Sequence, residues 1–336
     1  MASFSVSTIH SASDIPAAVW SAFRENAQAS NVMYAHADKA AKYPTLGGNA
    51  DLWMVVWDLT KPSETSSAVL FVLSCTAGPL GPYPIFIFTP LPSTLLVDNF
   101  VRPRLLAMVR ALRAAVSPER VFSVFAVDAL TDAFAASWTA ETGIKLDSNP
   151  LYYHASLMYC DRTTLRPPPP PPQGDGTIAL RLAAEADVRK VAVLCQDFSA
   201  TSEPFVLSCE KAVREAELLV QKRQLWVYEI QCPGREPEIA CIVAVTRTTA
   251  TVAGITKVFT DSRWRSRGCA ERLTWHVCQY LLETKDTVVL YVGHNNPAAK
   301  VYRRVGFVGF ASEHDGKPNS WKELGFDSSK IELGHW

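Results

Sequence analysis

Apolar and polar residues in the second half of the chain alternate with the periods of both strands and helices. The alternation at 177–183 predicts a strand, after which Val188, Val191 and Cys195 recur at helical spacing. Ser208 stands at the N-cap position of a second predicted helix, which runs to residue 224. The patterns predict these remaining elements: strands at 225–231, 238–248 and 250–260, a helix at 268–283, a strand at 287–293, a short helix at 297–306, and strands at 307–312 and 320–326.

The first half of the chain repeats much of this order. The patterns predict a helix at 15–27, strands at 52–59, 67–77 and 83–90, a helix at 97–116, a strand at 120–128, a helix at 130–143 and a strand at 151–159. Three strands, a helix, a strand, a helix and a strand therefore occur in both halves, which indicates an internal structural repeat. The expected class is α/β (α+β), with two lobes that each hold a mixed, mostly antiparallel twisted sheet flanked by helices.

A run of six prolines, Pro167 to Pro172, separates the two halves. Proline does not fit inside a helix or a central strand, and such a run favours the extended polyproline conformation. We therefore expect an N-terminal lobe at 1–162, a semi-rigid proline-rich linker at 163–176 and a C-terminal lobe at 177–336. A ligand for a proline-binding module is the alternative interpretation of the run.

The composition narrows the class of protein. Lys and Arg total 33 and Asp and Glu also total 33, so no net charge points to a nucleic-acid partner. The eight cysteines form no CxxC pair, and we expect reduced thiols and no metal site. The N-terminus lacks the pattern of a secretory signal, and no uninterrupted apolar stretch is long enough to span a bilayer. A soluble, cytoplasmic protein without a membrane partner is expected, and its oligomeric state stays open.

Candidate chemistry begins at residues 260–273, TDSRWRSRGCAERL, where Arg263, Arg265 and Arg267 precede Gly268 at the start of a predicted helix. Backbone N–H groups at a helix start have no intrahelical partner, and the helix dipole adds partial positive charge there. Gly268 permits close approach of a phosphate, and the arginines can add charge-assisted hydrogen bonds. The stretch therefore predicts a pyrophosphate-binding loop. Nucleic-acid binding is the alternative, and the neutral charge of the chain disfavours it.

A second motif follows at 295–307, with the sequence NNPAAKVYRRVGF. The strand at 253–260, the R-x-x-G-x-A loop at 265–270, the next helix and strand, and then N-x-x-A-x-x-x-Y-x-x-x-G-F resemble the GNAT superfamily of acyl-CoA N-acyltransferases. The resemblance covers about residues 177–326. The first half resembles the family only in its order of elements, so the chain resembles a tandem pair of GNAT-like lobes with a degenerate N-terminal lobe.

The resemblance implies that acetyl-CoA, as cosubstrate, lies between two splayed strands. Backbone groups of Val258, Phe259 and Thr260 would bond to the pantetheine arm, which Asn295 would also contact. Tyr302 matches the tyrosine that often protonates the departing CoA thiolate. The loop that would hold the pyrophosphate consists of Arg265, Ser266, Arg267, Gly268, Cys269 and Ala270.

The general base is left open, because the strand at 250–260 carries no acid. An acceptor amine is mostly protonated at neutral pH and must lose a proton before it attacks the thioester. His294, at the end of the strand beside the expected gap, is the preferred candidate. Glu229 and Glu203 are the alternatives, whereas His276, in the middle of a helix, is expected to serve packing.

The corresponding loop of the first half departs from the family pattern. It reads FTPLPSTLLVDNFVRPRL, with three prolines and no glycine. Prolines remove the N–H groups that would bind phosphate, so we expect this lobe to have lost CoA binding and to cover the catalytic lobe and shape the acceptor pocket.

The expected function is N-acyl transfer from acetyl-CoA to a primary amine of a small molecule, by direct attack in a ternary complex. The balanced charge favours a small acceptor over a protein or peptide. A protein or peptide N-acetyltransferase and a non-catalytic acyl-CoA-binding or interaction module remain the alternatives.

Overall fold

The computed structural model describes residues 3–43, 51–171, 176–309 and 320–335. The chain forms two compact units. Unit 1 comprises Met1–Leu157 together with Phe310–Trp336, and unit 2 comprises Met158–Gly309. In both units the main elements follow the order β-α-α-β-β-β-α-β-α-β, which contains the predicted repeat of three strands, a helix, a strand, a helix and a strand.

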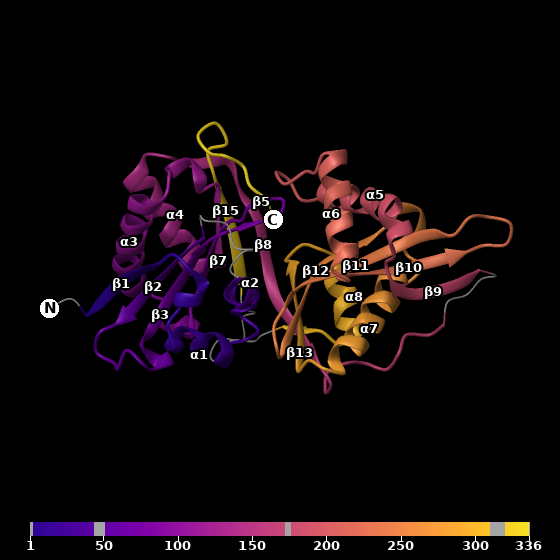
Figure 1. Cartoon of the computed structure of the whole chain (residues 1–336), viewed down its shortest axis with the longest axis horizontal. Coiled ribbons are helices and arrows are strands. Elements are labelled where there is room, and N and C mark those ends of the chain that lie inside the picture. Colours follow the sequence, from indigo (N-terminus) through magenta and orange to yellow (C-terminus); the bar gives the residue numbers. More distant parts are fainter. Residues whose placement is uncertain (1–2, 44–50, 172–175, 310–319, 336) are drawn as a thin grey trace. The chain divides into compact units, whose positions relative to one another are not determined.

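Unit 1 is built on a sheet with the strand order β1-β2-β3-β6-β7-β15-β8. Its described strand pairs are antiparallel except for β6 with β7, which run parallel. The strands are β1 (Phe4–Ile9), β2 (Leu52–Asp58), β3 (Val69–Cys75), β6 (Ile85–Phe88), β7 (Ser123–Val127), β8 (Leu146–Asp161) and β15 (Ser320–Phe326), with β4 (Ala77–Gly78) and β5 (Gly81–Pro82) as a separate short pair. The helices are α1 (Ala17–Glu25), α2 (Asn31–Lys42), α3 (Asp98–Ala115) and α4 (Asp128–Thr142) (Figure 1).

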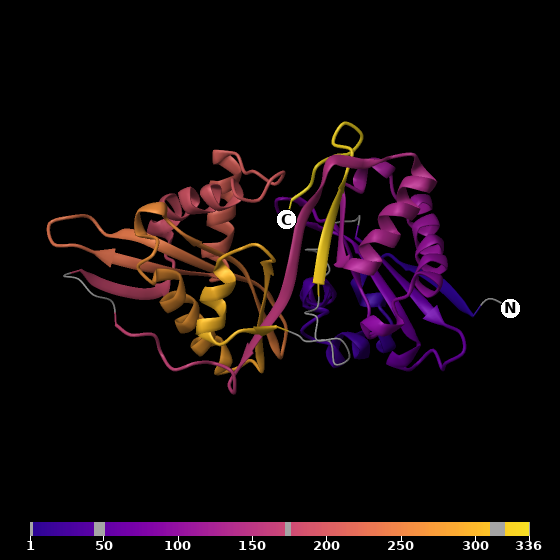
Figure 2. The ribbon, with the colours of Figure 1, turned by 180° about the vertical axis from the view of Figure 1, so that it is seen from behind.

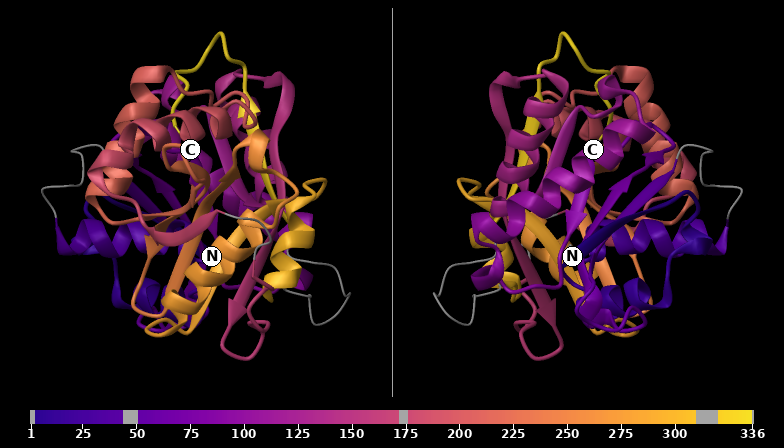
Figure 3. Two further views of the ribbon diagram at one scale, coloured as in Figure 1. Left: turned by 90° about the vertical axis from the view of Figure 1, so that its right-hand side faces the viewer. Right: turned by 90° about the vertical axis from the view of Figure 1, so that its left-hand side faces the viewer.

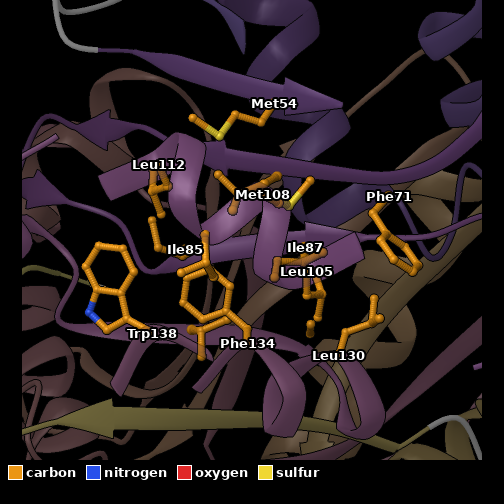
Figure 4. Packing of buried hydrophobic residues seen from close by; sticks show 14 of the residues in the cluster. Met54, Phe71, Ile85, Ile87, Leu105, Met108, Leu112, Leu130, Phe134 and Trp138 are labelled. Atoms are coloured by element: carbon orange, nitrogen blue, oxygen red, sulfur yellow. The ribbon is translucent and has the colours of Figure 1, made fainter. Parts of the chain in front are cut away.

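An apolar cluster of unit 1 lies between α3, α4 and one face of this sheet (Figure 4). Leu105, Met108 and Leu112 recur at helical spacing on α3, so all three are buried on one side of the helix. On α4, the rings of Phe134 and Trp138 stack with their centroids 5.9 Å apart. The strands β2, β3 and β6 are nearly continuous buried apolar runs, and together with these helices they give unit 1 a core of its own.

Besides the short pair β4–β5, the sequence did not predict β1 and α2 of unit 1. The segment of β1, FSVSTI, is mostly half-buried and pairs antiparallel with β2, so its structure depends on that partner. The helix α2 has a weakly apolar sequence, NVMYAHADKAAK, but it buries Val32, Met33 and Tyr34 against the rest of the unit. Tertiary packing decides both elements.

The strand predicted at 320–326 forms, but it belongs to unit 1, where it lies between β7 and β8 (Figure 2). The expected division at the proline run places residues 177–336 in a single lobe, whereas in the structure the chain leaves unit 2 after residue 309. The periodicity of a strand does not specify its partner. Here Leu324 and Phe326 complete the apolar cluster of unit 1.

Unit 2 contains a sheet with the strand order β13-β12-β11-β10-β9, in which β12 and β13 are parallel and the other described pairs are antiparallel. Helices α5 and α6 cover one face, and α7 and α8 cover the other (Figures 1 and 3). The elements are β9 (Thr177–Leu182), α5 (Val188–Ser199), α6 (Cys209–Gln221), β10 (Leu225–Gln231), β11 (Glu238–Thr248), β12 (Val252–Thr260), α7 (Cys269–Leu282), β13 (Thr287–Gly293), α8 (Ala298–Val305) and β14 (Val308–Gly309).

Two features at the edges of unit 2 refine the sequence predictions. Ser208 caps α6 as expected, because its side chain accepts a hydrogen bond from the Lys211 backbone N–H at 3.3 Å. The strand predicted at 307–312 is seen as β14, which pairs with the last residues of β8, and positions 310–312 lie outside the described residues.

Candidate functional site

The strands β12 and β13 separate partway along their length. Their parallel pairing joins residues 252–255 to residues 287–290, yet β12 continues to Thr260 and β13 to Gly293. On its other edge β12 stays paired with β11 as far as Thr260. The edge of residues 256–260 that faces β13 is therefore unpaired with that strand in the described structure, which leaves backbone groups for a ligand. Val258, Phe259 and Thr260 lie in this segment.

The loop that follows β12 is shaped by two residues in the left-handed region. Ser266 has a φ of 60° and Gly268 a φ of 74°. Gly268 is the N-cap residue of α7, and its carbonyl accepts the N–H of Arg272 at 3.1 Å. Within the described structure, the backbone N–H groups of Cys269, Ala270 and Glu271 have no hydrogen-bond acceptor from the protein. These donors, together with the helix dipole, suit an anion such as a pyrophosphate.

The three arginines of the loop differ in what their side chains contact. Arg263 is already occupied, because its guanidinium bonds to Asp261 at 2.7 Å and lies 2.9 Å from Glu238. Its hydrogen bonds hold the pKa of Asp261 below the usual value. Arg263 is therefore not available for phosphate in this arrangement, contrary to the sequence expectation.

Arg265 and Arg267 are exposed and have no carboxylate partner among the described residues. The Arg265 Nε donates to the Thr260 carbonyl at 3.2 Å, and its guanidinium lies 5.5 Å from the centroid of the Phe259 ring. The guanidinium of Arg267 lies 4.9 Å from the Trp264 ring. Both charges remain available to an anionic ligand.

Arg272, on α7, was missed by the sequence analysis. Its Nη1 donates to the Arg267 carbonyl at 2.7 Å, so a further guanidinium lies on the loop. A β-carbon built on Gly268 would lie only 2.5 Å from that nitrogen. The spacing of four residues between Gly268 and Arg272 could have predicted this contact. Helical side chains tilt toward the helix N-terminus, so the side chain of Arg272 lies over the turn that begins at Gly268.

The remaining loop residues are consistent with a spacer role. Cys269 is buried, and burial raises the pKa of its thiol, which disfavours the reactive thiolate. Its Sγ lies 3.6 Å from the Trp264 carbonyl oxygen. Ala270, half-buried, packs against the apolar cluster of unit 2.

The second sequence motif follows β13. Tyr302 lies on α8, is 8% exposed, and belongs to the same apolar cluster as Leu273 of α7 and Val292 of β13. Its ring meets Phe307 edge to face, with the centroids 5.9 Å apart. Asn295 and His294 are exposed in the turn between β13 and α8. The structure thus brings Tyr302 into the core of the unit and leaves the other two at its surface.

The candidates for a general base have different surroundings. Glu229 forms an ion pair with Arg181, which also bonds to Asp187 at 2.6 Å. Glu203 is exposed in the loop between α5 and α6. Burial lowers the pKa of His276, which fits a packing role.

The strand β12 carries a buried lysine, Lys257, whose carboxylate partner comes from a helix. Lys257 is 8% exposed, and its Nζ lies 2.5 Å from the Glu215 carboxylate of α6. The Nζ also lies 4.9 Å from the Phe198 ring. A carboxylate therefore reaches this strand from a helix, although the strand itself has none.

The corresponding loop of unit 1, between β6 and α3, has no such geometry. The helix α3 starts with the carboxylate of Asp98, and its N-cap is Val97, which provides no side-chain hydrogen bond. The N–H of Phe100 donates to the Val97 carbonyl at 2.9 Å, whereas the corresponding N–H of Glu271 in α7 has no acceptor among the described residues. The described structure therefore supports a single phosphate-type loop, in unit 2.

No helix in the described ranges has the length and apolar character needed to cross a membrane. Those same residues contain no cluster of three or more His, Cys, Asp or Glu side chains that could hold a metal ion.

Comparisons with known proteins concern residues 192–317 and the fold of the chain. A family model described as an acetyltransferase (GNAT) domain matches residues 192–317. A solved structure of a GCN5-related N-acetyltransferase from Sphaerobacter thermophilus aligns with 98% of this chain and 99% of its own, at 15% identity and a TM-score of 0.52. A Drosophila protein aligns with 95% of this chain and 98% of its own, at 11% identity and a TM-score of 0.62. At these identities the likeness is one of fold. The search of curated protein sequences gave no match.

Proposed function

We propose that the chain, whose residues 192–317 match the model of the GNAT acetyltransferase domain, transfers an acetyl group from acetyl-CoA to the primary amine of a small molecule. The observation that supports the proposal is that two features of unit 2, the unpaired edge of β12 and the loop at the start of α7, are adjacent along the chain. The open edge of β12 ends at the loop whose helix N–H groups have no acceptor among the described residues. One feature suits pantetheine amides and the other a pyrophosphate.

In the proposed reaction, the amine attacks the thioester directly in a ternary complex. The nitrogen forms a bond to the carbonyl carbon, the carbon–sulfur bond breaks, and the CoA thiolate leaves. Tyr302 donates a proton to that thiolate as general acid. His294 takes the proton from the acceptor amine as general base, because Glu229 is engaged by Arg181. Buried Cys269 has no part in the chemistry, so no acyl-enzyme intermediate is proposed.

A small-molecule acceptor is proposed because Lys and Arg balance Asp and Glu at 33 each. A large net charge on the chain would favour a macromolecular acceptor of opposite charge, and the formal net charge of this chain is zero. The proposed place of action is the cytoplasm, without a nucleic-acid or membrane partner. Unit 1, whose loop has proline and an acid in place of glycine, is proposed not to bind CoA.

The test is an assay of thiol release from acetyl-CoA in the presence of a panel of small primary amines. The proposal predicts release that depends on an amine and yields the N-acetylated product by mass spectrometry. Acetylation of peptide amines alone would shift the acceptor class to proteins. Tight binding of acetyl-CoA without release for any amine would favour a non-catalytic binding module.

A further inference from the structure

Arg272 joins two segments that are far apart in the sequence. Its Nη1 donates to the carbonyl of Arg267 in the CoA loop at 2.7 Å. Its Nε donates to the carbonyl of Pro170, in the proline run, at 2.9 Å. A guanidinium is planar and holds its donors in a fixed fork, so one side chain can fix both carbonyls at once.

The bond to Arg267 sets the direction of a peptide unit in the loop. In a trans peptide the carbonyl oxygen and the next N–H point to opposite sides. Because the Arg267 carbonyl points to Arg272, the N–H of Gly268 points away from that side chain. The space for this arrangement exists only because Gly268 has no β-carbon, which would lie 2.5 Å from the Arg272 Nη1.

The proline segment (residues 164–171) is itself fixed to unit 2. The Arg166 N–H donates to the Val305 carbonyl at 3.0 Å, and the Arg166 carbonyl accepts the Trp275 indole N–H at 2.8 Å. The segment also passes directly over Gly306, where a β-carbon would lie 2.3 Å from the Thr164 carbonyl oxygen. The described part of the expected linker is therefore docked along α7 and α8 and is not a free spacer.

We propose that Arg272 is a positioning residue of the acyl-CoA site and that the proline segment is its anchor. The segment holds the guanidinium, and the guanidinium holds the Arg267–Gly268 peptide in the orientation that leaves the loop N–H groups open to the pyrophosphate. Because the loop already has this geometry before the ligand binds, the entropy cost of ordering it on binding is smaller. The inference rests on the proposed function for its ligand, but the coupling of loop and segment exists without any ligand.

The experiment compares Arg272→Ala and Arg272→Lys with the unchanged protein by calorimetric titration with acetyl-CoA. Both variants should weaken binding by about tenfold or more, because a lysine keeps the charge but does not reproduce the two-carbonyl fork. The matched control is Arg304→Ala. It removes a guanidinium of α8 that lies 2.7 Å from the carboxylate of Glu271 on α7, the helix that carries Arg272, and it should leave the affinity within about twofold. Full binding by Arg272→Lys, or an equal loss in Arg304→Ala, would reduce the effect to charge alone and overturn the proposal.

Hydrogen exchange without ligand separates this inference from the proposed function. In Arg272→Ala and Arg272→Lys, the backbone amide of residue 272, which bonds to the Gly268 carbonyl, and the Arg166 amide, which bonds to the Val305 carbonyl, should exchange faster by about tenfold, while amides of β11 keep their protection. Faster exchange in both places supports the coupling even if acetyl-CoA does not bind. Unchanged exchange in the proline segment overturns it, whatever the activity of the protein.

Discussion

The Nζ of Lys257, on β12, lies 2.5 Å from the Oε2 of Glu215, on α6, and both side chains are largely buried. The pair links α6 to the strand that leads into the CoA loop. Breaking a buried pair on one side leaves an uncompensated charge, whereas replacing both partners by apolar residues can be nearly neutral.

We therefore expect Glu215→Leu alone to lower the free energy of unfolding by about 3 kcal/mol. The double variant Glu215→Leu with Lys257→Met should recover most of that loss. Urea unfolding of the two variants and the unchanged protein measures both effects. Equal destabilisation by the single and the double variant would show that the ion pair is not the source of the loss.

Gly268 differs from another glycine of unit 2 in a way that allows a matched comparison. Both Gly268 and Gly234 have left-handed backbones, with φ values of 74° and 71°. A β-carbon on Gly234 would meet nothing within 4 Å, whereas on Gly268 it would displace Arg272. Gly234→Ala should cost about 1 kcal/mol of stability through backbone strain alone, without a change in acetyl-CoA affinity.

Gly268→Ala should cost more and should weaken acetyl-CoA binding by about tenfold. Thermal unfolding and calorimetric titration of the two variants give the comparison. Wild-type affinity in a folded Gly268→Ala variant would remove this glycine from the CoA loop.

Tyr302→Phe tests the proposed general acid. Loss of the hydroxyl should lower kcat by about tenfold or more, with little change in acetyl-CoA affinity. Tyr280→Phe is the control, because Tyr280 lies on α7 and is 51% exposed. Steady-state kinetics with an accepted amine decide the matter, and an unchanged kcat in Tyr302→Phe would exclude the acid role.

Glu323, in the middle of β15, makes the stability of unit 1 depend on pH. Its side chain is fully buried, one oxygen accepts the Ser123 hydroxyl at 2.6 Å, and the other has no partner among the described residues. Burial raises the pKa of Glu323 to about 8. Between the unfolded value of about 4.3 and this folded value, the native state keeps a proton that the unfolded state has lost.

The free energy of unfolding should therefore fall as the pH rises through that window, with a slope of up to about 1.4 kcal/mol per pH unit from this group. Glu323→Gln cannot ionise and should remove the slope. Urea unfolding at about pH 6 and about pH 8 measures it for both proteins. The same pH dependence in Glu323→Gln would assign the effect to other groups.

Local patterns in the sequence predicted most helices and strands, as well as the loop and helix on which the candidate site is built. The periodicity at 268–283 and the residues around Gly268 predicted α7 and its loop, because a helix start and a left-handed glycine have local signatures. The partner of β15 could not be predicted, since the strand pairs with residues nearly two hundred positions earlier. The sequence did not show that Arg263 is engaged by two carboxylates, because one of them, Glu238, comes from a neighbouring strand. The contact of Arg272 with Pro170 could not be predicted either, since the two residues lie about a hundred positions apart.

The most direct test of the central claim is calorimetric titration of the full chain with acetyl-CoA, repeated with a CoA fragment that lacks the pyrophosphate. We expect binding of about one equivalent per chain, through unit 2, and a clear loss of affinity for the fragment. Absence of binding would contradict the assignment of the β12 edge and the Gly268 loop to acyl-CoA. Binding of two equivalents would contradict the account of unit 1 as a lobe without a CoA site.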